Sequence, residues 1–145
     1  MIKSEYFEIH ELVPELMYHQ IKEEVLWRLI PINLIHTIDA IKFHYPNGHM
    51  TINNYEWGGD RHWSGLRLAG QPFYSSTSQH SYLRATDSIF NKYNVSDIRR
   101  YIIKNPKQFP YIGGLELNVS WLHTDIRPRI HDRILTFGKP LSKIK

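Results

Sequence analysis

The spacing of apolar residues changes part-way along the chain, and this change restricts the fold more than any other feature. Over residues 14–45, apolar residues recur at steps of three and four, which is the pattern of amphipathic helices. Beyond residue 50, short alternating or continuous apolar runs indicate strands, with one more helical stretch at 96–105. Helices followed by strands and a single helix predict an α+β fold, in which helices flank an antiparallel sheet.

The boundaries of these elements follow from local signals. One helix is expected over residues 14–30, ended by Pro31, and a second over 33–45 with Asn33 as its N-cap. The polar, glycine-bearing stretch at 58–80 has little periodicity, and loops of this length in compact domains are usually functional. Strands, one of which could be a hairpin, are expected at 49–57, 82–90, 113–127 and 133–138.

Composition narrows the class of protein. A chain of 145 residues fits one domain, and we expect a monomer by default. The net charge is +4, but the basic residues form no stripe upstream of Arg127, so no nucleic-acid partner is expected. No stretch resembles a signal peptide or a membrane span, so action at a cell wall would need another route of delivery.

The absence of cysteine excludes disulfides, thiolate metal sites and cysteine nucleophiles, so a metal site must use His, Asp and Glu. The stretch SQHSYLRATD places His80 and Asp87 seven positions apart, and His123 follows in SWLHTDIR. If the two strands lie side by side, these three residues offer the donor set of a catalytic zinc with an open position for water. The spacing alone also fits an alternative in which Asp87 caps a turn and His80 lies on the surface.

Three stretches occur in the order found in one enzyme family: SGLR at 64–67, SQHSYLRATD at 78–87 and WLHTD at 121–125. The chain resembles the zinc D-alanyl-D-alanine carboxypeptidases. That family includes the L-alanyl-D-glutamate endopeptidases of phage endolysins and shares its fold with the Hedgehog signalling domain. Its pattern is S-G-Y/L-R, then S-x-H-x-x-G-x-A-x-D, then an aromatic residue before H-x-D. The resemblance covers about residues 53–127, roughly half of the chain.

The resemblance implies one zinc-peptidase-like domain over residues 1–145, with helices at about 14–45 and the motifs within about 50–127. It implies that Zn²⁺ is bound by His80, Asp87 and His123, and that water activated by the metal hydrolyses a peptide bond in peptidoglycan stem peptides. A phage or prophage origin would then account for delivery to the cell wall.

A role for Arg67 also follows from the resemblance. This residue matches the family arginine that contacts the substrate carboxylate or the developing oxyanion. A guanidinium suits that role because it stays charged and presents forked donors. The alternative is that Arg67 forms an ordinary surface ion pair.

Two positions depart from the family pattern. Leu83 stands where Gly is usual, so the turn after His80 is expected to differ in its backbone. Ser120 lies three residues before His123, where many members carry the Glu or Asp that acts as general base, and a serine cannot replace a carboxylate in that role.

Two other carboxylates are candidates for the base. Glu116 precedes His123 by seven residues, and an odd separation within one regular strand puts it on the opposite face unless a bulge or bend intervenes. Asp125 shares the strand face of His123, so it is expected to orient a histidine or to act as the base.

The sequence therefore fits two different functions. The first is a zinc peptidase acting on peptidoglycan. The second is a catalytically weak or inactive metal-binding module of the same fold, which binds cell wall or a protein partner, since fold does not determine function. A carboxylate close to the open metal position would distinguish them.

Overall fold

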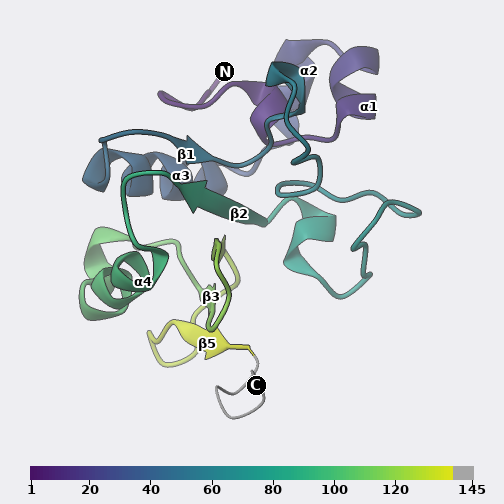
Figure 1. The fold of residues 1–145 in the computed structure, drawn as a ribbon. Coiled ribbons are helices and arrows are strands. Elements are labelled where there is room, and N and C mark those ends of the chain that lie inside the picture. The colour runs from purple at the N-terminus through teal and green to yellow at the C-terminus, as the bar shows by residue number, and fades with distance from the viewer. Residues whose placement is uncertain (139–145) are drawn as a thin grey trace.

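A computed structural model describes residues 1–138, which are built around a five-stranded sheet (Figure 1). The strands lie in the order β1–β2–β4–β3–β5. Their bounds are β1 Met50–Thr51, β2 Ala85–Phe90, β3 Gly114–Glu116, β4 Leu122–Asp125 and β5 Leu135–Phe137. With the helices they form a small single-domain α+β fold, so the predicted fold class is confirmed.

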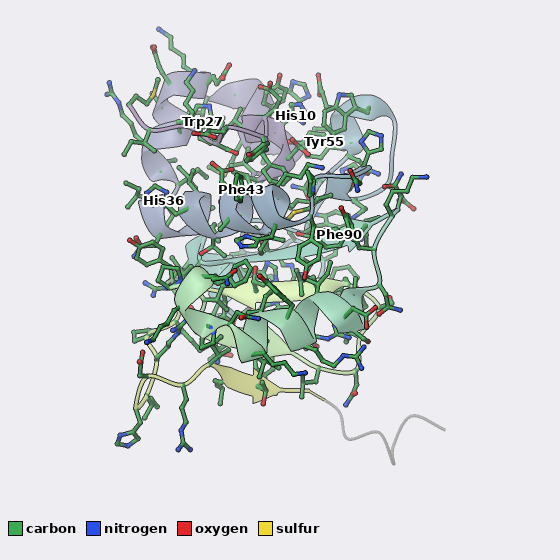
Figure 2. All side chains as sticks on the ribbon, turned by 90° about the vertical axis from the view of Figure 1, so that its left-hand side faces the viewer. His10, Trp27, His36, Phe43, Tyr55 and Phe90 are labelled. Atoms are coloured by element: carbon green, nitrogen blue, oxygen red, sulfur yellow. The ribbon has the colours of Figure 1, made fainter. Side chains whose placement is uncertain are left out.

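Helices α3 and α4 lie next to each other and cover one side of the sheet, as the view from that side shows (Figure 2). The four α-helices of the described residues are α1 Glu15–Gln20, α2 Glu23–Leu29, α3 Ile32–His44 and α4 Val95–Lys104. Four 3-10 helices accompany them: η1 Ile9–Glu11, η2 Tyr55–Trp57, η3 Gln79–Tyr82 and η4 Pro106–Gln108. Within residues 1–138, no helix is both long and apolar enough to cross a membrane.

The sheet is mixed, so the prediction of an antiparallel sheet is wrong in one pairing. The pairs β1–β2, β2–β4 and β3–β4 are antiparallel, but β5 runs parallel to β3. After β4 the chain turns back, and Arg129 donates hydrogen bonds to three carbonyls within residues 106–112. The Leu135 N–H then donates to the carbonyl of Gly113, so β5 starts at the same end of the sheet as β3.

The first predicted helix is two helices, because the chain is extended between α1 and α2. Ile21 and Lys22 have extended backbones, and Ile21 packs against the core from that position. The apolar spacing continues across this break, although Leu16 is exposed while Leu26 is fully buried. A regular apolar spacing therefore did not indicate a continuous buried face.

Helix α3 confirms the predicted helix but begins one residue earlier than expected. Pro31 is its N-cap, with φ −58°, and Asn33 lies inside the helix. Proline suits the start of a helix because its fixed φ and missing N–H cost nothing there. The four residues of its predicted apolar face are all buried: Leu34, Ile35, Ile38 and Ile41.

The two faces of the sheet differ in chemistry. Leu115 of β3 and Leu122 of β4 join the hydrophobic core, together with residues of α3 and α4. Asp87 of β2 pairs with His123 of β4, and directly opposite residues in an antiparallel pair point to the same face. Since neighbours along a strand alternate, Leu122 and His123 face opposite ways. One face therefore carries the core and the other is polar.

Glu11 is a buried acid at the N-terminal side of the domain, with 5% of its surface exposed. Its side chain accepts a hydrogen bond from the Glu8 N–H, and its carbonyl accepts one from the Asn53 N–H. Burial removes hydration from the carboxylate and raises the pKa of Glu11 from 4.5 to about 7.

We expect Glu11→Gln to stabilise the protein relative to wild type as pH rises from about 4.5 to 7.5. In this window the folded state holds the Glu11 proton that the unfolded chain has lost, so the wild-type stability falls as pH rises. The difference in unfolding free energy should grow by on the order of 2 kcal/mol, allowing for residual contact with solvent. Urea unfolding at both pH values measures it, and equal pH dependence of the two proteins would contradict the prediction.

Candidate metal centre

His80, Asp87 and His123 converge on the polar face of the sheet. One possible ligand atom from each lies within 4.8 Å of the other two. Asp87 and His123 are paired across β2 and β4, and His80 lies in η3, just before β2. Their residues are 3%, 9% and 6% exposed in chain order. The predicted convergence of these three side chains is confirmed, and their group is close enough to hold a metal ion.

A hydrogen bond to the backbone orients the His80 ring. Its Nδ1 lies 2.8 Å from the carbonyl oxygen of Gly65, and a carbonyl can only accept, so Nδ1 carries the proton. In the neutral ring Nε2 is then a free acceptor, directed at Oδ1 of Asp87 at 3.2 Å. The Gly65 segment packs closely, since a Cβ there would meet the carbonyl oxygen of Leu12 at 2.2 Å. The SGLR stretch thus helps to orient the His80 ring.

His123 lies between two carboxylates. Its Nδ1 is 2.9 Å from Oδ1 of Asp87, and its Nε2 is 2.9 Å from Oδ2 of Asp125. Asp125 is fully buried and accepts two hydrogen bonds from the Arg127 side chain, at 2.7 and 2.6 Å. Gly114 lies opposite Asp125 in β3, and a Cβ there would be 2.5 Å from the carboxylate oxygens. The glycine therefore leaves the space that Asp125 occupies.

The charges of this row of residues are tightly coupled. Burial alone would raise the pKa of Asp87, but the hydrogen bonds from His123 and His80 outweigh it and hold that pKa well below its usual range. Burial would lower the pKa of His123, but its hydrogen bonds to Asp125 and Asp87 raise it to about 9. Burial likewise opposes ionisation of Asp125, yet His123 and Arg127 lower its pKa to about 2.

These contacts favour a positive charge within the cluster. If both histidines are neutral and donate through their outer nitrogens, the lone pairs of His80 Nε2 and His123 Nδ1 both face the same oxygen of Asp87. Such an arrangement is repulsive unless a cation lies between them. A proton on His123, whose pKa is raised, supplies this positive charge. A metal ion held by two nitrogens and one oxygen would supply it equally well.

Arg67 makes an ion pair with the cluster itself. Its Nη2 donates to Oδ2 of Asp87 at 3.0 Å, and its Nε donates to the carbonyl of Trp63 at 2.7 Å. The side chain is 15% exposed, so this is a largely buried pair rather than a surface one. By holding Oδ2, Arg67 leaves Oδ1 of Asp87 facing the two histidines.

Glu116 lies on the same face as the cluster. The pairing of β3 with β4 joins Gly114 to Asp125 and Leu115 to Thr124, and the next step of this register puts Glu116 opposite His123. Glu116 and His123 also line the same cleft. The two residues lie on different arms of a hairpin, so the chain bends between them, and their odd separation does not put Glu116 on the other face.

Ser120 lies away from the cluster. It is exposed and lines a separate hollow together with Ile89 and Arg99. His80, Asp87 and His123 instead line the cleft that contains Glu116. The position at which the family pattern places a base is therefore outside the site in this chain.

Two clefts meet at the cluster. One, of about 390 Å³, is lined by residues 60–64, and the other, of about 410 Å³, by residues 77–80 together with side chains from β3, β4 and β5. Both volumes lie within the range of pockets that hold small molecules. Four residues line both clefts: Arg67, Phe73, Asp87 and Trp121. Trp121 is thus part of the cleft wall.

Several residues of the site were not predicted from sequence. Arg61 donates to the carbonyls of Ile52 and Asp87 and so anchors the long loop to β2. Arg127 binds Asp125, and its two-residue spacing from Asp125 was a signal that it shares the same strand face. Phe137 lies 5.5 Å from His123, ring to ring, but its distance along the chain offered no such signal.

No protein-family model, curated protein or solved structure matches this chain. The resemblance to the zinc peptidases therefore depends on its three motifs, and the geometry of the cluster is an observation independent of them.

Leu83 has the backbone conformation that glycine adopts most easily. Its φ of 57° and ψ of 38° lie in the left-handed region, at the end of η3. The leucine at this position therefore does not require a different turn from the one a glycine would favour. The leucine side chain is 6% exposed and packs in the core, which offsets the strain of this conformation.

We expect Leu83→Gly to be more stable than Leu83→Ala by about 1 kcal/mol, the reverse of the usual order in a regular element. Both variants lose the buried side chain and should be less stable than wild type by about 2–4 kcal/mol. Only the glycine variant also loses the strain of the left-handed backbone. Urea unfolding of the three proteins gives the order, and a more stable alanine variant would contradict the prediction.

Proposed function

We propose that this chain is a zinc-dependent peptidase that hydrolyses a peptide bond in peptidoglycan stem peptides. The observation that carries the proposal is the cluster of His80, Asp87 and His123 beside a cleft that Glu116 also lines. The three motifs of the zinc D-alanyl-D-alanine carboxypeptidase family support the choice of substrate. Action at the cell wall, in a phage or prophage setting, belongs to the same proposal.

The donor set is suited to zinc. Two imidazole nitrogens and one carboxylate oxygen make a three-ligand set of the kind found in catalytic zinc sites, which keep one position open. Zinc in such a site supplies a Lewis acid and lowers the pKa of water to about 7. The chain offers no thiolate, so a structural cysteine site is not an alternative.

Glu116 is the proposed general base. Its carboxylate faces the cleft from β3, opposite His123, and it is partly exposed rather than locked in a buried ion pair. It takes a proton from the attacking water as the oxygen adds to the carbonyl carbon. It then gives that proton to the amine nitrogen as the peptide bond breaks, so that one water is consumed for each bond.

Asp125 is the proposed positioning residue for His123. It is fully buried, its two oxygens are bound by Arg127, and its pKa of about 2 makes it a poor proton acceptor near neutral pH. It accepts a hydrogen bond from the Nε2–H of His123, which leaves Nδ1 free to bind a metal ion. Of the two roles that sequence left open for Asp125, orientation is the better supported.

Arg67 has two proposed roles. Its Nη2 holds Oδ2 of Asp87, so that Oδ1 faces the histidines. Because Arg67 lines both clefts, its Nη1 group also provides positive charge where the carbonyl oxygen of a substrate becomes negative.

The serine at position 120, where the family pattern has its base, favoured the alternative of a metal-binding module without activity. That residue lies outside the site, while a carboxylate from the other arm of the hairpin lines the cleft. These positions favour hydrolysis over binding alone.

Zinc binding should depend on Asp125 as well as on the three ligands. We expect His123→Ala to abolish tight zinc binding and Asp125→Asn to weaken it by about 10–100-fold, since loss of an orienting carboxylate typically has an effect of that size. Competition with a chromophoric chelator measures both affinities. His19→Ala, at an exposed histidine that is not part of the cluster, is the matched control and should bind zinc as wild type does. Unchanged zinc affinity in His123→Ala would contradict the assigned ligands.

Hydrolysis should depend on Glu116 and not on Ser120. We expect Glu116→Gln to reduce the release of amino groups from peptidoglycan by at least about 100-fold, the size of a general-base contribution, while it keeps its zinc. Ser120→Ala should retain activity near that of wild type. If Glu116→Gln kept its activity, or Ser120→Ala lost it, Glu116 would not be the base. A zinc-loaded wild type that is inactive on several wall types would favour the binding module.

A further inference from the structure

Phe73 is an exposed aromatic residue at the place where the two clefts meet. Its surface is 75% exposed, although it is one of the four residues that line both clefts. The hydrophobic contribution of a side chain scales with the apolar area that folding removes from water. An exposed phenyl ring therefore contributes little to the stability of the folded chain.

The backbone of Phe73 is also strained. Its φ is 62°, in the left-handed region that glycine adopts readily but that places the Cβ of other residues too close to the backbone. Strained residues of this kind are concentrated at sites that bind ligands, where the surrounding structure imposes the conformation. A residue that is both strained and exposed is better explained by a contact with a ligand than by packing.

Hydrogen bonds on both sides of Phe73 impose this conformation. Before it, the Gln71 N–H donates to the carbonyl of Leu68 at 3.0 Å, and Oε1 of Gln71 accepts from the Leu68 N–H at 2.8 Å. After it, the Tyr82 hydroxyl donates to the carbonyl of Ser76 at 2.6 Å. The ring is thus presented to the clefts from a loop that is fixed at both ends.

Arg67 connects Phe73 to the cluster of His80, Asp87 and His123. The guanidinium carbon lies 5.9 Å from the centre of the Phe73 ring, and Nη1 is 3.5 Å from the Phe73 carbonyl oxygen. The same guanidinium donates to Oδ2 of Asp87 at 3.0 Å. A single side chain therefore lies between the ring and the cluster. A peptide whose reacting bond is at the cluster has its neighbouring residue at the ring.

The surroundings of the ring select an uncharged partner. Trp63 lies 6.3 Å from Phe73, ring to ring, and lines the first cleft, while Trp121 lines both clefts. Aromatic surfaces of this kind bury apolar groups. Aromatic rings also attract cations, but the positive charge of Arg67 beside the ring opposes a second cation there. An apolar side chain is therefore the partner that fits.

We propose that Phe73 is a substrate-binding residue, whose ring packs against an apolar side chain next to the bond that is hydrolysed. This rests on the proposed peptidase function and adds a preference in substrate recognition to it. In stem peptides the apolar side chains are the methyl groups of alanine. Binding of the substrate covers the exposed ring, and the apolar area removed from water contributes to affinity.

The test measures binding separately from turnover. Calorimetry gives the dissociation constants of a stem pentapeptide ending in two D-alanines for zinc-loaded Glu116→Gln, with and without Phe73→Ala. The same peptide with each alanine in turn replaced by glycine identifies the methyl group that contacts the ring. Hydrolysis of peptidoglycan by Phe73→Ala, with Glu116 intact, gives KM and kcat, and urea unfolding gives its stability.

Tyr74→Ala is the matched control. Tyr74 is the next residue in the same loop, is 39% exposed and lines neither of the two clefts. We expect its dissociation constant, KM and kcat to stay within about threefold of the values for the parent protein, since its ring is not placed to meet the substrate.

We expect Phe73→Ala to raise the dissociation constant and KM by about tenfold, the effect of losing an apolar contact of this size, with kcat changed less than about threefold. The urea midpoint and zinc affinity should stay near those of the parent protein. One alanine-to-glycine replacement in the peptide should weaken binding by about threefold or more, and that effect should disappear in Phe73→Ala.

Two results would overturn the proposal. If Phe73→Ala bound the peptides as its parent does but unfolded at lower urea, the ring would be structural. If kcat fell while KM and the dissociation constants stayed the same, the ring would act by holding Arg67 and not by contacting the substrate. A wild type that neither binds the pentapeptide nor hydrolyses peptidoglycan would instead refute the proposed peptidase function.

Discussion

The register between β2 and β4 determines whether this chain has a site at all. It pairs Asp87 with His123, and a shift by one residue would turn one of them toward the hydrophobic core. The register is held from outside the strands as well as within them. The Asp87 N–H donates to the carbonyl of Ser64, and the Ile126 N–H donates to the carbonyl of Arg84. The long loop and the end of β4 thus fix the alignment that brings Asp87 and His123 together.

Arginine side chains bind several loops to the sheet through hydrogen bonds to backbone carbonyls. Strands of two to six residues offer few ladder bonds, and the chain has no cysteine to link its loops covalently. Arg99, for example, is 6% exposed and donates to the carbonyls of Val119 and Trp121, which holds the loop between β3 and β4. A guanidinium suits this role because its several donors reach two or three carbonyls at once.

The sequence predicted local structure and the convergence of His80, Asp87 and His123 well, and the relations between distant strands less well. Apolar periodicity identified the buried face of α3, and motif order pointed to the three side chains that converge in the structure. The parallel pairing of β5 was not predictable, because it depends on where Arg129 holds the returning chain. The face on which Glu116 lies was left open for a related reason, since parity along a strand says nothing about residues across a hairpin.

The hairpin has a consequence for how such sites vary among proteins. Glu116 and His123 are aligned by pairing between β3 and β4, and the five residues between the two strands take no part in that pairing. The connecting loop can therefore lengthen or shorten without moving the carboxylate relative to the histidine. A motif written as a fixed number of residues between base and ligand would overlook chains of this design, whereas one written as a pair of strand positions would find them.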